Sequence, residues 1–302
     1  MAARTTTTGP ILLVGAAGQL GTALEPRLAR LGQVVRATRA EVDLEQVDQI
    51  RALVRRMQPS VVVNAAAYTA VDDAERDEAR CARLNAIAPT VLAEETARLA
   101  VPLVHFSTNY VFDGTQSAAY TETVPTSPLS VYGATKAEGE RGVAGANPRH
   151  LIIRTAAVYG GEARNFLRRI LELARERDEL RIVADQFVSP TPAWALADAA
   201  VAAAAVMMHR DAVRYGVAGL YHVTTTGSSS WYQFARRIVE LDPNRSAHLV
   251  RSVVAISTSD FPTPARRPAN GTLDVGLFER TFSYTLPGWE EALRRTFEGA
   301  NL

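Results

Sequence analysis

The sequence predicts an α/β fold, a doubly wound parallel sheet joined to a smaller, loop-rich unit. Two observations predict the sheet: short apolar runs alternate with amphipathic helical segments over the first half of the 302 residues, and glycines follow the first run at positions 15, 18 and 21. Such alternation is typical of βαβ units with helices on both faces of a sheet. The loop-rich unit is predicted by a third observation, because stretches rich in Pro and Ser interrupt the rhythm after about residue 156.

Each element follows from its own pattern. Short runs of apolar and β-branched residues predict buried strands, and apolar residues spaced three or four apart predict helices. Pro89 is expected to begin a new helix inside a longer helical stretch, because proline is tolerated only in the first turn. The expected strands cover residues 11–14, 34–38, 61–63, 103–107 and 151–158, and the expected helices cover residues 22–31, 47–57, 79–99, 166–177, 194–208 and 231–241.

Composition excludes several classes of protein. The net charge is +1, so no strong field exists to hold nucleic acid or an anionic membrane. No apolar run approaches the ~20 residues of a membrane span. The Thr-rich start lacks the apolar core of a signal peptide. A single cysteine, Cys81, excludes an internal disulfide and a cysteine zinc site. We therefore expect a cytoplasmic protein without nucleic-acid or membrane partners.

Lysine usage singles out one position. Of the 33 basic residues, only Lys136 is a lysine, which leaves 32 arginines. Such a bias suggests that arginine replaced lysine wherever either residue served. Chance retention is the alternative, but a surviving lysine is expected where a compact ammonium is needed and a planar guanidinium does not fit.

The glycine loop predicts a dinucleotide site in a Rossmann-like fold. Residues 15–21 read GAAGQLG, between an expected strand and an expected helix. Glycines there allow a tight turn and let the backbone approach a pyrophosphate, which the helix N-terminus then stabilises. An ordinary glycine-rich turn is the alternative reading of the motif alone. The strand–loop–helix context favours the cofactor site.

The end of the second strand indicates which cofactor binds. An Asp or Glu usually meets the free 2′-hydroxyl of NAD, whereas this strand ends in Arg36-Ala37-Thr38-Arg39. Arg39 or Arg36 could pair with a 2′-phosphate, although either could also be a solvated charge. We expect NADPH as the cofactor, with NADH as a second one that could also be used. Asp43 and Leu44 follow at a distance suited to the adenine.

Two residues form a candidate proton-transfer pair. Tyr132 and Lys136 are four apart and share one face if the segment is helical. A nearby ammonium stabilises phenolate, so we expect Lys136 to lower the pKa of Tyr132, making it a better general acid toward a carbonyl oxygen. The spacing alone is common on helix surfaces, but here it includes the only lysine.

Thr108 completes a candidate catalytic triad. It follows an expected strand, and ligands of open α/β sheets bind outside the carboxyl ends of strands. Its hydroxyl could orient a substrate carbonyl, or it could cap a turn; the glycine loop and the Tyr-Lys pair favour the first role. Asn109 and Tyr110 come next, so no carboxylate pair is available for a dehydration. A carbonyl reduction fits better.

These motifs resemble the dTDP-4-dehydrorhamnose reductase family of the extended short-chain dehydrogenase/reductases. The resemblance runs in family order over nearly the whole chain. The matching segments are 15–21 (GAAGQLG), 64–75 (NAAAYTAVDDAE), 107–114 (STNYVFDG), 128–140 (PLSVYGATKAEGE), 154–160 (RTAAVYG), 185–191 (DQFVSPT), 219–222 (GLYH) and 265–274 (ARRPANGTLD).

The resemblance implies a reaction and a division of the chain. The reaction would be NADPH-dependent reduction of the C4 ketone of dTDP-4-dehydro-6-deoxy-L-mannose, giving dTDP-L-rhamnose. Residues 1–155 would form the NAD(P)-binding Rossmann domain. Residues 156–302 would mainly bind the nucleotide sugar, with some segments returning to the first domain.

It also implies roles for individual residues. Tyr132 would donate the proton, Lys136 would hold the nicotinamide ribose, and Thr108 would bind the C4 carbonyl oxygen. With the glycine loop and the second strand, the expected cofactor-binding set is Gly15, Gly18, Gln19, Leu20, Thr38, Arg39, Asp43, Leu44, Ala67, Tyr68, Thr69, Tyr132 and Lys136. The expected substrate-binding set is Thr108, Asn109, Ala157 and Arg267, whose planar fork matches diphosphate oxygens.

The chain departs from the family pattern at three places. Asn109 stands where the family usually has Asp, Ala156 and Ala157 replace Ser-Trp, and Val188 replaces a glycine. Loss of the Trp removes ~150–250 Å² of contact surface, so we expect a larger and differently polar sugar pocket than in the family. The glutamates that hold magnesium in some relatives have no counterpart here, and no metal is expected.

Two other functions are weighed against this one. The nearer is a 4-ketoreductase acting on another dTDP-deoxysugar, which the changes at Asn109 and Ala157 make credible. The second is a non-catalytic nucleotide-binding subunit, since one branch of the superfamily resembles a regulatory subunit of methionine adenosyltransferase. Retention of Thr108, Tyr132 and Lys136 argues against that branch. The sequence leaves the oligomeric state open, with a homodimer as one option.

Overall fold

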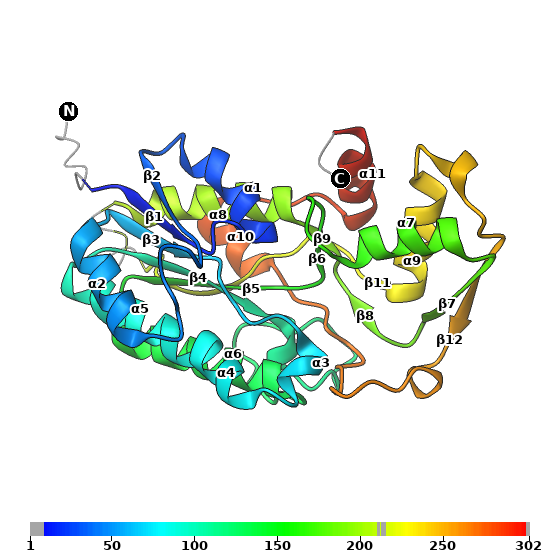
Figure 1. The fold of residues 1–302 in the computed structure, drawn as a ribbon, viewed down its shortest axis with the longest axis horizontal. Coiled ribbons are helices and arrows are strands. Elements are labelled where there is room, and N and C mark those ends of the chain that lie inside the picture. Colours follow the sequence, from blue (N-terminus) through cyan, green and yellow to red (C-terminus); the bar gives the residue numbers. More distant parts are fainter. Residues whose placement is uncertain (1–8, 210–211, 213–215, 300–302) are drawn as a thin grey trace.

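A six-stranded parallel sheet forms the centre of the larger lobe (Figure 1). The computed structural model describes residues 9–209, 212 and 216–299. The strand order is β10-β5-β4-β3-β1-β2, and every neighbouring pair is parallel. The strands are β1 (Ile11–Val14), β2 (Val34–Ala37), β3 (Val61–Asn64), β4 (Leu103–Thr108), β5 (His150–Thr155) and β10 (Gly219–His222).

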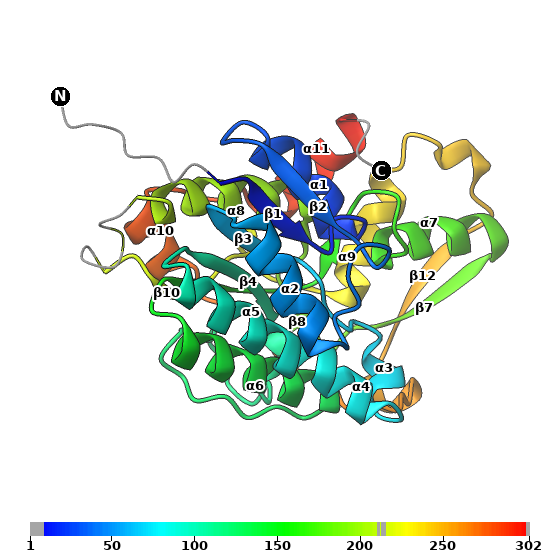
Figure 2. The same cartoon turned by 60° about the vertical axis from the view of Figure 1, so that its left-hand side comes forward.

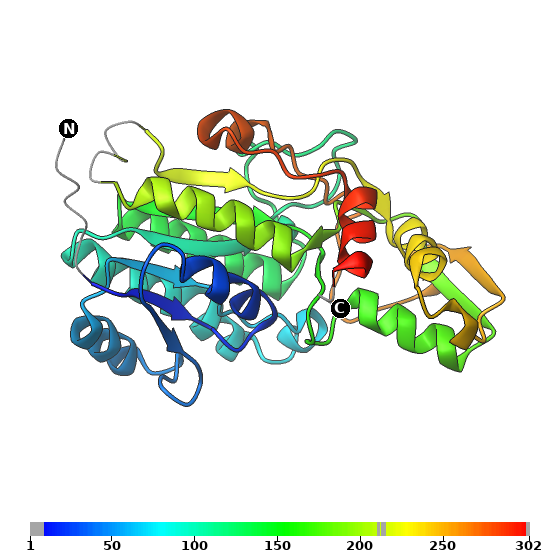
Figure 3. The same ribbon diagram turned by 90° about the horizontal axis from the view of Figure 1, so that it is seen from above.

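Helices cover both faces of this sheet. Figure 2 shows α2 (Val47–Met57), α5 (Ala88–Arg98) and α6 (Val131–Ala146) on one face. Figure 3 shows α1 (Gln19–Leu28) and α8 (Ala193–Met207) on the other, and the two are in contact. Because successive strand residues point to opposite faces, Leu13 and Val63 pack on the α1 side, whereas Leu12 and Val62 pack on the α2 side. The doubly wound fold predicted from the sequence is confirmed.

The smaller lobe is built from short ladders and helices around an aromatic core (Figures 1 and 3). Tyr159 and Phe234 are fully buried there, with ring centroids 5.1 Å apart. Only two-stranded ladders occur among its described residues. Its elements are β6 (Val158–Tyr159) with β9 (Thr191–Pro192), β8 (Phe187–Val188) with β11 (Ser229–Ser230), β7 (Glu179–Val183) with β12 (Ser252–Ile256), α7 (Phe166–Glu176), α9 (Trp231–Leu241), η3 (Arg245–Ala247), η4 (Thr258–Asp260) and α11 (Trp289–Glu298).

Several segments after residue 155 return to the larger lobe. Strand β10 pairs with β5, α8 packs on α1, and α10 (Gly276–Phe282) packs on β10 and α8. The division of the chain at residue 155, with segments returning to the first domain, stays a prediction.

The helical stretch before β4 has an irregular middle. It contains α4 (Glu78–Ala82), a π-helical turn η1 (Arg83–Ile87) and then α5, in which Pro89 is the second residue. Helix α5 is counted from Ala88, beside Pro89, but Ile87 and Ala88 both keep helical backbone angles, so the stretch continues through the π turn without a break. Two shorter elements complete the lobe, α3 (Val71–Ala74) and the 3₁₀ turn η2 (Asn109–Val111).

Two further observations concern the whole described chain. Among its helices, none is long and apolar enough to cross a membrane. Nor do the described His, Cys, Asp and Glu side chains include a group of three or more arranged to hold a metal ion.

A buried ion pair ties α6 to the sheet behind the site. The guanidinium of Arg154 on β5 donates two hydrogen bonds to the Glu140 carboxylate, at 2.6 and 2.8 Å. Arg154 also lies over the Phe112 ring, 5.0 Å from its centroid. Both charged side chains are buried and have lost their hydration. The attraction between the two charges compensates for this desolvation cost.

We expect Glu140→Ala to lower the free energy of unfolding by about 3–5 kcal/mol, because it leaves the Arg154 guanidinium buried without its partner. Glu291→Ala is the matched control, since Glu291 pairs with Arg294 at 2.7 Å on the surface and should lose less than about 1 kcal/mol. Urea unfolding followed by circular dichroism measures both. Equal losses in the two variants would contradict the assigned role of the buried pair.

Candidate active site

The glycine loop has a backbone that only glycine accommodates. Gly15 has a φ of +78°, and a Cβ there would lie 2.6 Å from the backbone nitrogen of Ala66. Gly18 is the N-cap of α1 and brings no side chain to cap the helix. The first-turn N–H groups of α1 are thus accessible to an anion, and the helix dipole favours one there. The loop fits a dinucleotide pyrophosphate.

Gln19 connects this loop to the smaller lobe. Its side-chain amide donates hydrogen bonds to the carbonyl oxygens of Gly160, at 3.0 Å, and Val158, at 3.4 Å. Its amide nitrogen therefore holds the β6 segment beside the glycine loop. Leu20 is half-buried and packs against the core on the α8 side.

A carboxylate occupies the end of β2. The backbone N–H of Thr38 donates to the Glu41 carboxylate at 2.7 Å, and the Thr38 hydroxyl donates to the same oxygen. These hydrogen bonds lower the pKa of Glu41. This carboxylate is not evident from the sequence because Glu41 lies four residues beyond β2 and folds back. Arg39 is exposed beside it, whereas Arg36 lies 3.5 Å from Glu25 of α1.

The expected adenine contacts lie in the following turn. Asp43 is exposed, and its carboxylate accepts the backbone N–H of Glu45 at 2.9 Å. Leu44 is half-buried against the core beneath α2.

The loop after β3 is clamped by Asn85. The Asn85 side chain accepts the backbone N–H of Tyr68 at 2.8 Å and donates to the Tyr68 carbonyl at 3.0 Å. Asn85 belongs to the π turn η1, so the irregular helix supplies the clamp. The clamp leaves Ala67 half-buried and Thr69 exposed in the loop beside the glycine turn.

The structure brings the three predicted catalytic residues together. Helix α6 places Tyr132 and Lys136 one turn apart, and its N-terminus is capped by Ser130, whose Oγ accepts the N–H of Gly133 at 3.2 Å. Thr108 ends β4, and its side chain lies near enough to the Tyr132 hydroxyl to lower the pKa of Tyr132. The Tyr110 ring meets that of Tyr132 edge to face at 5.6 Å.

The pKa of Tyr132 differs from the expected value. Burial raises the pKa of Tyr132 to about 12, and the hydrogen bond with Thr108 only partly opposes this rise. The prediction that Lys136 lowers the pKa of Tyr132 is therefore wrong for the protein without ligands. The reason is geometric: the Lys136 head group lies against β4, with its Nζ 2.5 Å from the Phe106 carbonyl oxygen. Tyr132 is protonated near neutral pH and able to donate.

Lys136 is itself deeply buried, with 1% of its surface exposed. Burial lowers the pKa of Lys136 to about 8, and the nearby Glu140 and Cys81 act in the opposite direction. Besides the Phe106 carbonyl, the Lys136 Nζ contacts Nε2 of His105 at 3.2 Å. The only lysine of the chain thus lies in a closed slot, as expected for a position that a larger guanidinium cannot occupy.

Two predicted substrate residues have defined local roles. Asn109 is buried; its amide donates to the Gly271 carbonyl at 3.2 Å, and its oxygen accepts the Thr108 hydroxyl at 3.4 Å. A Cβ at residue 271 would lie only 2.1 Å from the Asn109 amide nitrogen. The Asn109 side chain therefore needs a glycine at position 271. Ala157 has a φ of +45°, an uncommon conformation for a residue with a side chain.

Arg267, the predicted diphosphate partner, is paired within the protein. Its fork donates to both oxygens of Asp72, at 3.0 and 2.7 Å. Its charge also acts on the Tyr110 side chain, whose ring contacts that of Tyr132. A substrate phosphate would therefore share this guanidinium with Asp72.

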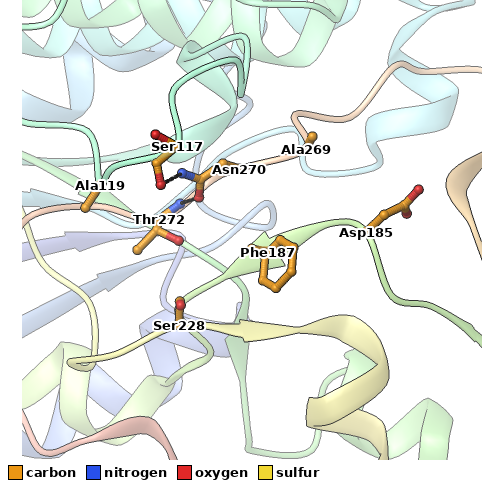
Figure 4. Close-up of a pocket in the computed structure, with 8 residues that line it drawn as sticks. All are labelled: Ser117, Ala119, Asp185, Phe187, Ser228, Ala269, Asn270 and Thr272. Carbon is orange, nitrogen blue, oxygen red and sulfur yellow. Dashed lines mark hydrogen bonds between the residues drawn. The ribbon is translucent and has the colours of Figure 1, made fainter. Parts of the chain in front are cut away.

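A shallow cavity of about 470 Å³ lies close to the site and is shown in Figure 4. Asn270 and Thr272 line it, whereas Gly271 between them faces Asn109. The Asn270 side chain accepts the Thr272 N–H at 3.0 Å, so residues 270–272 form a turn between this cavity and Asn109. The full lining is Ser117, Ala119, Asp185, Phe187, Ser228, Ala269, Asn270 and Thr272.

Sequence reasoning missed four contributors: Asn64, His105, Asn85 and Glu41. Asn64 and His105 are polar residues inside apolar strands, and that contrast is the signal that could have identified them. Asn85 gave no comparable signal, because its role depends on the π turn. Glu41 could have been found from Thr38, since Thr-x-x-Glu is a capping-box pattern.

The comparisons with known proteins agree with this geometry. The sequence model of the RmlD substrate binding domain matches residues 9–301. A dTDP-4-dehydrorhamnose reductase from Burkholderia thailandensis is 45% identical, covering 94% of this chain and 96% of that protein. A probable dTDP-4,6-dihydroxy-2-methyloxan-3-one 4-ketoreductase from Streptomyces antibioticus is 40% identical, covering 95% and 94%.

A solved structure resembles the fold over its whole length. The dTDP-4-dehydrorhamnose reductase of Bacillus anthracis, crystallised in complex with NADP, superposes with a TM-score of 0.84 at 31% identity, covering 96% of this chain and 99% of that one. With the family model and the Burkholderia thailandensis relative, this likeness spans both lobes and every predicted site residue. The chain belongs to the dTDP-4-dehydrorhamnose reductase family, described by the RmlD substrate binding domain model.

Proposed function

We propose that this protein reduces the C4 ketone of dTDP-4-dehydrorhamnose to dTDP-L-rhamnose with NADPH. The observation that carries the proposal is the meeting of Thr108, Tyr132 and Lys136 at the carboxyl ends of strands that also present the glycine loop. Family membership supports the same reaction, and so does the NADP complex of the Bacillus anthracis relative.

The protein's own part in the reaction is to bind and orient the substrate and to protonate its carbonyl oxygen. Bound NADPH would supply the hydride that adds to C4 of the sugar. The Tyr132 hydroxyl then gives its proton to the carbonyl oxygen, so that one hydride and one proton convert the ketone to an alcohol. Thr108 would help to place the carbonyl oxygen beside the Tyr132 hydroxyl, and the family resemblance implies that Lys136 would hold the nicotinamide ribose.

The smaller lobe and its borders would hold the nucleotide sugar. Asn109 fixes the direction of the Thr108 hydroxyl, and Ala157 leaves open the space that a tryptophan fills in relatives. Arg267, oriented by Asp72, would meet the diphosphate. We also propose a cytoplasmic location, and a homodimer is the first assembly to test by sedimentation.

A second substrate is favoured by one specific observation. The Streptomyces antibioticus relative is named for another 4-ketoreduction, and Ala157, where the family has Trp, would leave more room for a different sugar. The deciding experiment is an assay of the purified protein with a panel of 4-keto nucleotide sugars and both nicotinamide cofactors. NMR of the product then gives the configuration at C4. Failure to oxidise NADPH with any sugar would favour a non-catalytic binding protein and overturn the proposal.

Tyr132→Phe should bind NADPH with unchanged affinity but lower kcat by about 100-fold or more, because only the proton donor is removed. Fluorescence titration of NADPH and steady-state assays measure the two properties separately. A variant with near-normal kcat would contradict the role of Tyr132.

Lys136→Arg should lose more than about nine tenths of kcat/KM while keeping its fold, because the planar guanidinium is larger than the slot that Lys136 fills. Near-ultraviolet circular dichroism confirms the fold. Retention of more than a tenth of kcat/KM would show that a positive charge of any shape suffices.

Cofactor choice should depend on two charges at the end of β2. Arg39→Ala is expected to weaken NADPH binding about tenfold and to leave NADH binding nearly unchanged, since only NADPH carries the 2′-phosphate. Glu41→Gln should strengthen NADPH binding, because it removes the negative charge that would repel the 2′-phosphate at this strand end. Titrations of both cofactors at low salt measure these effects. Equal changes for the two cofactors would show that neither residue faces the 2′-phosphate.

A further inference from the structure

A chain of three buried polar side chains runs from the glycine loop to the catalytic lysine. Asn64 ends β3, His105 lies on β4 and Lys136 on α6; they are 2%, 1% and 1% exposed. The Asn64 amide nitrogen lies 3.1 Å from Nδ1 of His105, and Nε2 of the same ring lies 3.2 Å from Nζ of Lys136. The His105 ring is therefore the only group between the other two.

The hydrogen bonds of this chain restrict the proton on His105. Burial and the Lys136 charge hold the pKa of His105 well below its usual range, so the ring is neutral and carries one proton. A neutral imidazole donates from one nitrogen and accepts at the other. Since both neighbours are nitrogen atoms, the ring cannot accept from Asn64 and from a Lys136 ammonium at once.

The backbone decides which side accepts. The oxygen of the Asn64 side chain already accepts the N–H of Ala66 at 3.2 Å, in the loop that touches Gly15. Turning the amide round would set its NH₂ group against that N–H. With Asn64 held this way, Nδ1 of His105 accepts, and the ring proton lies on Nε2, facing Lys136.

The other titratable groups around Lys136 are few, and each is either paired with another side chain or neutral. Glu140, one turn along α6, is paired with Arg154 of β5. Cys81 of α4 is buried and contacts the Thr135 hydroxyl at 3.2 Å. Tyr132 is neutral, with its pKa raised by burial. Among the described titratable groups, His105 is the one whose side chain lies within hydrogen-bond distance of the Lys136 Nζ.

We propose that Asn64 and His105 are positioning residues that set the proton state of Lys136. The amide of Asn64 selects the His105 tautomer with its proton on Nε2, and this N–H favours the neutral amine of Lys136 over the ammonium. The relevance to catalysis rests on the proposed function, whereas the proton state itself does not. Asn64 then determines the pH at which the reductase loses its lysine charge.

The single lysine makes this measurable without substrate. In protein labelled with [ε-¹³C]lysine and lacking a lysine-containing tag, Lys136 gives the only lysine resonance. Its chemical shift against pH reports the pKa directly. A wild-type midpoint near pH 8 is expected from the burial of the group.

Asn64→Asp is the informative variant, because it is nearly isosteric and still accepts the Ala66 N–H. A carboxyl oxygen facing Nδ1 accepts the ring proton, so Nε2 becomes an acceptor for the ammonium. The Lys136 midpoint should rise by about one pH unit or more. An unchanged midpoint overturns the proposal.

A double-variant cycle separates this route from direct attraction between charges. In the His105→Leu background the ring is absent, so Asn64→Asp should move the midpoint by less than about 0.3 unit. An equal rise with and without His105 would mean that the carboxylate acts through space, and it overturns the proposal. If His105→Leu does not fold, as judged by thermal melting, His105→Gln takes its place, since an amide cannot exchange tautomers.

Turnover provides a second readout. If the reductase assay succeeds, Asn64→Asp should extend the alkaline limb of kcat/KM by the same shift as the resonance. A lower rate with an unmoved limb would indicate a merely structural role for Asn64 and would overturn the link to catalysis.

Discussion

The close approach of α6 to its neighbours is the constraint on which the site depends. A Cβ at Gly133 would lie 2.2 Å from the Tyr110 carbonyl oxygen, and one at Gly139 would lie 2.1 Å from the Asn85 carbonyl oxygen. Only glycines allow this distance, and it brings the Lys136 head group within reach of the β4 backbone. The same contact excludes water from the lysine slot. Burial, the low pKa of Lys136 and the narrowness of its slot therefore have one cause.

Features that depend on neighbouring residues could be predicted from the sequence. The glycine loop, the helical placement of Tyr132 and Lys136, and Thr108 at a strand end all follow from local patterns, and the structure contains each of them. Parallel strands align their carboxyl ends, so these local motifs converge without further information. The fold class was predictable for the same reason.

What could not be predicted depends on partners far apart in the chain. Asn64 and His105 are 41 residues apart, and Arg267 and Asp72 are 195 apart. The sequence showed the types of these residues but not which of them meet. The pKa of Tyr132 was predicted in the wrong direction because charge proximity was judged from helix spacing, while burial had the larger effect.

The clamp at Asn85 has a consequence for the free energy of cofactor binding. Asn85 contacts α6 through its backbone and the loop around Tyr68 through its side chain, so it holds that loop against the helix that carries Tyr132 and Lys136. A loop already ordered before binding loses little conformational entropy when a ligand arrives. With such preorganisation, the free energy of dinucleotide binding comes mainly from contacts between ligand and protein. Ordering of the loop then adds little unfavourable entropy.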